Sequence, residues 1–80
     1  MKPRLTVGTK NIVGRKVYAV RKSKRIKQKD FLAMLQTEGM DISASSLSRL
    51  EGQQRLVQDY ELAPLAKALG ITIDELLREN

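Results

Sequence analysis

Apolar residues recur along the chain at the spacing of one face of an α-helix, in five runs separated by polar or glycine-containing stretches. The first run follows Asn11, a residue type that commonly caps helices, and this helix is predicted to end near residues 23–25. Its expected buried residues are Val13, Val17 and Val20.

The second and third runs are separated by a short turn that contains Gly39. We predict a second helix from Gln28 to Glu38, with an apolar stripe made of Phe31, Leu32 and Leu35. Ser43 suits the N-cap of a short third helix, residues 44–51, whose expected buried residues are Leu47 and Leu50. The two helices and their turn have the layout of a helix-turn-helix.

Two further helices are predicted after a polar loop, residues 52–58. The fourth helix is expected to be capped by Asp59 or Gln58 and to be ended by Gly70, with apolar positions Leu62, Leu65, Ala66 and Leu69. Thr72 is expected to cap the last helix, whose apolar positions are Ile73, Leu76 and Leu77. Because no run has the alternation of a strand, the pattern predicts an all-α protein of five short helices.

Length and composition limit the chain to one small domain. Its 80 residues, 41% of them hydrophobic, suffice for a single modest core. Residues 1–10 contain Pro3 and Gly8 and few large aliphatic side chains, so we predict a flexible basic arm there and one folded domain over residues 11–80.

Charge is more segregated along the chain than the net value of +6 suggests. The first 29 residues hold eleven Lys or Arg and no acid, whereas the rest hold four against nine, so the two parts carry +11 and −5. A basic surface that docks on a polyanion gains affinity from counterion release, which makes nucleic acid the expected partner. A solvated basic surface without a partner and an anionic membrane surface are the alternatives.

Residues that carry catalytic chemistry are scarce. The chain has no cysteine, no histidine and no phosphate loop, and its carboxylates are scattered. We therefore expect no enzyme activity, metal, cofactor or small-molecule ligand. No run approaches the roughly 20 apolar residues that cross a bilayer, and the first ten residues lack the apolar stretch of a secretory signal, so we expect a cytoplasmic protein without membrane contact.

The helix-turn-helix layout alone does not indicate DNA binding, because it also occurs in proteins that never touch DNA. Particular residues of this sequence make the prediction more specific. They are Arg21, Gln28, Leu32-Ala33, Ile42-Ser43, Leu47-Ser48, Leu50-Glu51, residues 65–71 and residues 73–77. In this order they resemble the phage repressor and Cro-type family over residues 11–77. The resemblance implies a five-helix, lambda-repressor-like fold. It also implies a transcriptional regulator, expected to be a repressor, that binds specific double-stranded DNA with helix 44–51 in the major groove.

The resemblance also implies roles for single residues. Arg21 and Glu51 are expected to form an internal ion pair, Gln28 to touch phosphate and brace the reading side chains, and Arg55 to contact the DNA backbone. Other expected phosphate contacts are Lys27, which precedes Gln28, and Ser43, the predicted cap.

Bases should be read by the exposed residues of the third helix, which are Ala44, Ser45, Ser48 and Arg49. Arg49 is the only long donor among them, and an arginine in the major groove most often takes guanine. Serine and alanine contribute modest hydrogen bonds or contact a thymine methyl group.

Two departures from the family pattern concern the third helix. About four more residues than usual separate Leu32-Ala33 from Ile42-Ser43, so the second helix is longer or the turn wider. The chain also has Gly52-Gln53 after Glu51, where the family more often has its glycine one residue later. Both departures bear on the angle and the end of the third helix.

The assembly state and a second function class stay open at this point. Proteins of this layout commonly bind DNA as two-fold dimers with recognition helices about 34 Å apart, so we expect a homodimer. Its interface is expected on the last two helices, although core packing also explains Leu76 and Leu77. The alternative function is a protein-interaction module, such as an antitoxin-like partner. RNA binding has less support because the chain has only three aromatic residues.

Overall fold

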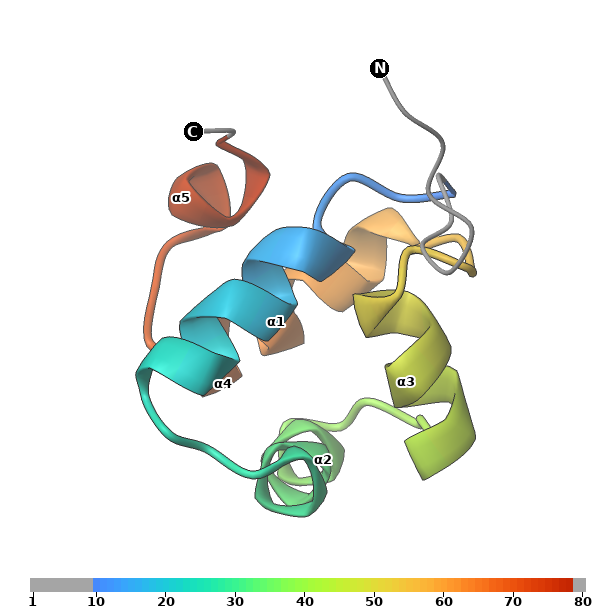
Figure 1. Cartoon of the computed structure of the whole chain (residues 1–80), viewed down its shortest axis with the longest axis vertical. Helices are drawn as coiled ribbons and strands as arrows, with labels where there is room; N and C mark the ends of the chain where they lie inside the picture. The colour runs from blue at the N-terminus through green and yellow to red at the C-terminus, as the bar shows by residue number, and fades with distance from the viewer. Residues whose placement is uncertain (1–9, 79–80) are drawn as a thin grey trace.

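The computed structural model describes residues 10–78, and within that range it contains helices and no strand (Figure 1). Its elements are α1 (Gly14–Ser23), α2 (Gln28–Thr37), α3 (Ala44–Glu51), the short 3-10 helix η1 (Asp59–Glu61), α4 (Leu62–Leu69) and α5 (Ile73–Leu77). The all-α class with five α-helices is therefore confirmed. The predicted arm lies outside the described residues except for Lys10.

The helices enclose one hydrophobic core. In Figure 1, α1 crosses in front of α4 at the centre, with α2, α3 and α5 around them. Contacts join α1 to α3, α4 and α5, and join α2 to α3 and α4. All five α-helices supply fully buried side chains, among them Val17, Phe31, Leu35, Leu47, Leu50, Leu65, Leu69 and Leu76. The helical periodicity of the sequence thus identified most of the core. The differences are that Val20, Leu32 and Leu62 are only partly buried, that Ile73 and Leu77 are exposed, and that the buried Met40 and Ile42 were not predicted.

Side-chain caps fix the starts of three helices. Ser43 Oγ accepts the Ser46 N–H at 3.1 Å, and Thr72 Oγ1 accepts the Glu75 N–H at 3.0 Å, as the sequence predicted. Asn11 Oδ1 accepts the Gly14 N–H at 2.7 Å, but the helix itself begins at Gly14, with Val13 in the N-cap position. The prediction that Asn11 directly precedes the helix was therefore wrong, although its side chain does accept a hydrogen bond from the first helical residue.

The ends of α1, α2, α3 and α4 share one backbone motif. The residue after the last turn adopts a left-handed conformation, and its N–H and the next N–H return to carbonyls of that turn. At α2 this residue is Gly39, and Met40 N–H donates to Leu35 O at 3.0 Å. Gly70 takes the same place after α4, but Arg25 and Gln53 take it after α1 and α3, both with φ near 59°. Left-handed backbone is unfavourable for residues other than glycine, and at both positions the two returning backbone hydrogen bonds hold it.

The extended connection between α2 and α3 is packed against the core. It spans residues 38–43, from the end of α2 at Thr37 to the start of α3 at Ala44. Met40 and Ile42 are buried, and Gln36 Nε2 donates to Ile42 O at 3.0 Å. These contacts fix where α3 begins relative to α2.

No helix among residues 10–78 has the length and apolar character needed to cross a bilayer.

Candidate nucleic-acid interface

The helix α3 presents one exposed polar face and one buried apolar face. The predicted base-reading residues share the exposed face, and they are Ala44, Ser45, Ser48 and Arg49. Arg49 Nη1 donates to Ser45 Oγ at 3.1 Å, one helical turn away. On the opposite face, Leu47 and Leu50 are fully buried. The structure therefore brings the four residues together on a surface that is open to a partner.

The expected ion pair between Arg21 and Glu51 joins α1 to the end of α3. Arg21 Nε lies 2.7 Å from Glu51 Oε2 and Arg21 Nη2 lies 3.1 Å from Glu51 Oε1, which makes the contact bidentate. The two side chains are only 8% and 5% exposed. Arg21 Nη1 also donates to Ile26 O at 2.8 Å, and the Tyr18 ring lies 5.4 Å from the guanidinium carbon. The pair therefore holds three elements: α1, the loop after it, and α3.

Gln28 extends this network to the exposed face. Its Nε2 donates to Glu51 Oε1 at 3.2 Å, and its Oε1 accepts from Ser48 Oγ at 3.4 Å. Gln28 is the first residue of α2, where the helix dipole leaves a positive end. Lys27 precedes it and is exposed. Gln28 therefore lies next to the predicted base-reading Ser48, and Lys27 is the residue directly before it in the sequence.

A second set of contacts, which the sequence did not predict, joins the start of the domain to the end of α3. Asn11 Nδ2 donates to Leu50 O at 3.2 Å and to Arg55 O at 2.8 Å. Gln53 Nε2 donates to Asn11 O at 2.9 Å, and Lys10 N–H donates to Gln53 O at the same distance. Because the partners lie about 40 residues apart, no local sequence signal could have found them.

Gly14 lies directly against the backbone of α3. A β-carbon at this position would overlap the carbonyl oxygen of Leu50 and approach Asn11 Oδ1 to 2.8 Å. Only glycine permits this approach, which brings α1 and α3 close enough for Asn11 to bridge them. At the nearby end of α3, Gln53 takes the left-handed position and the preceding Gly52 does not.

Arg55 makes an internal ion pair in the structure. Its Nη2 lies 2.8 Å from Glu61 Oε2, its Nε donates to Ser46 Oγ at 2.8 Å, and the two charged side chains are 22% and 8% exposed. Burial raises the pKa of Glu61, but hydrogen bonds from Arg55 and from the Gln58 N–H outweigh it, and the net pKa is lowered. The phosphate contact expected of Arg55 stays a prediction, and it would compete with this pair.

Lys24 also has a structural role within the basic run that follows α1. Its Nζ donates to Leu69 O at 2.6 Å, where the last carbonyls of α4 lack helical partners. At least one cation of the charged N-terminal part therefore stabilises a helix end, and its positive charge is turned toward the body of the domain.

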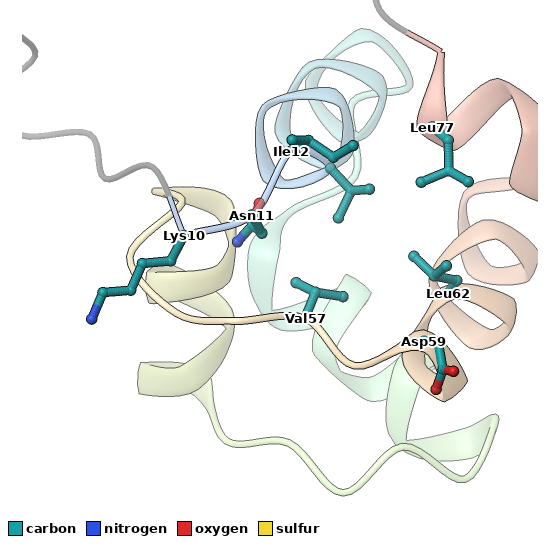
Figure 2. Close-up of a pocket in the computed structure, with 8 residues that line it drawn as sticks. Lys10, Asn11, Ile12, Val57, Asp59, Leu62 and Leu77 are labelled. Carbon is teal, nitrogen blue, oxygen red and sulfur yellow. The ribbon is translucent and has the colours of Figure 1, made fainter.

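A groove lies on a different part of the molecule. It has a volume of about 330 Å³ and is lined by Lys10, Asn11, Ile12, Val13, Val57, Asp59, Leu62 and Leu77 (Figure 2). Ile12 is 64% exposed and Leu77 is 41% exposed, so apolar surface faces solvent here. None of the lining residues belongs to α2 or α3.

Comparisons with known proteins add no relative. No protein-family model, curated protein or solved structure matches the chain. Residues 10–78 also contain no cluster of three side chains of the kinds that hold a metal ion. A functional assignment therefore depends on the arrangement of α1, α2 and α3.

Proposed function

We propose that this chain is a transcriptional regulator, acting as a repressor, that binds specific double-stranded DNA with α3 in the major groove. In this proposal α2, the turn and α3 form a lambda-repressor-like helix-turn-helix. The observation that supports it most strongly is that α3 has two different faces. The core and a buried ion pair hold one face, and short side chains with one arginine occupy the other.

The composition of the open face supports this proposal. Short side chains let the backbone of a helix approach the base edges closely, and Arg49 supplies the long donor that recognises guanine O6 and N7. Ser43, at the front of the helix, uses its oxygen to accept the Ser46 N–H, which leaves its hydroxyl proton for a phosphate.

Electrostatics supports the same orientation. Lys27, exposed at the start of α2, lies in the part of the chain that carries eleven basic residues and no acid. A phosphate at this end of α2 would meet the Lys27 ammonium and the free N–H groups of the first helical turn.

We further propose that two copies act together on DNA. Two recognition helices reach successive major grooves only when a dimer spaces them about 34 Å apart. The groove between Ile12 and Leu77 offers apolar surface for pairing, and pairing there would leave α2 and α3 free for DNA. Leu76 is part of the core, so of the two leucines in α5 only Leu77 is available to an interface.

The proposal is tested by repeated selection from a random duplex pool at two salt concentrations, followed by sequencing. We expect a two-fold-symmetric site that contains a guanine in each half and binds two chains. Recovery of DNA with no enriched sequence, lost uniformly as salt rises, would overturn the proposed sequence-specific function.

The groove also favours one alternative, a protein-interaction module with DNA binding as a secondary property. Its exposed apolar residues, Ile12 and Leu77, suit a protein partner. Salt separates the two functions because phosphate contacts weaken steeply with ionic strength whereas apolar contacts persist. A complex with another protein that survives salt sufficient to strip DNA from the chain would favour the alternative.

A further inference from the structure

One hydrogen-bonded chain runs from the buried ion pair to the open face of α3. Its links are Arg21 to Glu51, Gln28 to Glu51, and Ser48 to Gln28. They cross three helices, from α1 to the end of α3, then to the start of α2, and back to the exposed side of α3. Ser48 therefore connects to a buried charge through a single side chain.

This series of hydrogen bonds has a fixed donor-to-acceptor direction. The Arg21 guanidinium only donates and the Glu51 carboxylate only accepts, so the side of Gln28 that faces Glu51 must be its NH2 group. The amide oxygen of Gln28 then faces Ser48, and the hydroxyl of Ser48 must donate to it. At 3.4 Å this last contact is the longest of the series, so its main effect is on the direction of the hydroxyl and not on stability.

From this direction we infer that Glu51, acting through Gln28, sets Ser48 to read DNA as a hydrogen-bond acceptor. This inference deepens the proposed function and rests on it. A hydroxyl has one hydrogen and two lone pairs, so Ser48, with its hydrogen committed to Gln28, presents only lone pairs outward. A serine without such a partner would donate or accept freely.

The group that an acceptor recognises in the major groove is an amino group. Only the N6 amino group of adenine and the N4 amino group of cytosine donate there, whereas guanine and thymine present acceptors. Ser48 should therefore contact adenine or cytosine through the amino group, while the exposed guanidinium of Arg49 takes the acceptors of guanine. Gln28 and Glu51 are positioning residues for this contact.

The test uses the full chain and the duplex recovered by selection. Comparison with Ser48→Ala first identifies the base pair at which the two proteins differ. At that pair the amino group is then deleted, with purine in place of adenine or 2-pyrimidinone in place of cytosine. In a second duplex, the N7 acceptor is deleted with the 7-deazapurine. Binding of both proteins to both duplexes completes the comparison.

Loss of the amino group should weaken wild-type binding about threefold to tenfold, the effect of one hydrogen bond, and should leave Ser48→Ala unchanged. Loss of N7 should weaken the DNA binding of wild type and Ser48→Ala equally. The inference is overturned if the N7 effect depends on Ser48 and the amino effect does not, or if no base pair distinguishes Ser48→Ala. Failure of the selection to yield any site overturns the proposed function instead, and this inference with it.

Two further variants test the positioning. Gln28→Ala frees the Ser48 hydroxyl to rotate, so the penalty for deleting the amino group should shrink toward its value in Ser48→Ala. Lys29→Ala, at the next and exposed position, should keep the full penalty. An unchanged penalty in Gln28→Ala would show that Gln28 does not orient Ser48, and would overturn the inference.

The orientation of the Gln28 amide is measurable without DNA. In 15N-labelled protein, nuclear Overhauser effects from the Gln28 NH2 protons should be stronger to Glu51 side-chain protons than to the Ser48 β-protons. The reverse pattern means a flipped amide and overturns the inference, whatever the selection yields. If the Overhauser effects follow the expected pattern but the selection yields no enriched DNA site, the proposed function is wrong and the orientation of Gln28 is not.

Discussion

The two faces of α3 differ in what holds them. The inner face is fixed by the core, by the buried Arg21–Glu51 pair and by the close approach of Gly14. On the outer face, Arg49 donates a hydrogen bond to Ser45 of the same helix, and Ser48 donates one long hydrogen bond to Gln28. One helix therefore combines a rigidly positioned backbone with exposed side chains that a partner can reach.

This difference separates stability from binding. Contacts on the inner face use groups that are desolvated in the folded protein, so their loss should lower the free energy of unfolding. Contacts on the outer face use solvated side chains, so their loss should leave unfolding unchanged and alter only the complex. Variants on the two faces should therefore fall into two classes.

The largest effect is expected from Glu51→Gln. This variant removes the charge opposite a buried guanidinium, which typically costs about 3–5 kcal/mol and should lower the melting temperature. Urea unfolding at neutral pH measures the loss. The control is Glu38→Gln, because the partner of Glu38, Lys67, lies 3.4 Å away and is exposed. This variant should lose less than about 1 kcal/mol of the free energy of unfolding. Equal stability of the two variants would contradict the assigned role of the pair.

The next effect is expected from Gly14→Ala. The added methyl group would meet the Leu50 carbonyl and force α1 away from α3, at a cost of about 1–3 kcal/mol. Gly52→Ala is the matched control because its added carbon would have ordinary contacts and its φ of −86° suits alanine. The control should remain within about 1 kcal/mol of the wild type. Thermal unfolding compares them, and an equally stable Gly14→Ala would rule out the close approach.

A smaller effect, dependent on pH, is expected at Glu61. Because its pKa in the folded protein is lowered below the usual value of 4.5, the carboxylate contributes stability above that value. The contribution is lost as pH falls through the lowered pKa. Urea unfolding from neutral pH down to about pH 3 should show that the stability advantage of the wild type over Glu61→Gln shrinks toward acid. A difference independent of pH would contradict the Arg55–Glu61 assignment.

The prediction for Lys27→Ala concerns binding alone. Removal of one phosphate contact should weaken binding to all duplexes alike and reduce the slope of affinity against salt by about one. The melting temperature should not change because Lys27 is exposed. Affinity titrations at several salt concentrations measure the slope. The control is Lys67→Ala, on α4, which should leave the salt slope unchanged. A change of similar size in the slopes of both variants would argue against a phosphate contact at Lys27.

The sequence predicted features that depend on nearby residues better than those that depend on packing. Ser43 and Thr72 could be assigned as caps because each bonds an N–H three residues away. The core followed from helical periodicity, but periodicity placed Leu76 and Leu77 on one face and could not tell that only Leu76 reaches the core. Burial at the end of a short helix depends on what packs against it.

The candidate site shows the same limit. The Arg21–Glu51 pair was predicted from a family resemblance and not from spacing, since 30 residues separate the partners. The same resemblance assigned Arg55 to phosphate, whereas the structure pairs it with Glu61. The hydrogen bonds from Asn11 to the Leu50 and Arg55 carbonyls had no signal in the sequence. The order Gly52-Gln53 was visible in the sequence, but the left-handed conformation of Gln53 became apparent only in the structure.

The most direct test of DNA reading by the outer face of α3 is the affinity of Arg49→Ala for the selected site and for a scrambled duplex of equal length. We expect a loss of about 1–3 kcal/mol on the selected site, a much smaller loss on the scrambled duplex, and an unchanged melting temperature. Equal losses on both duplexes would make Arg49 a mere electrostatic contact. No loss on either would contradict the account.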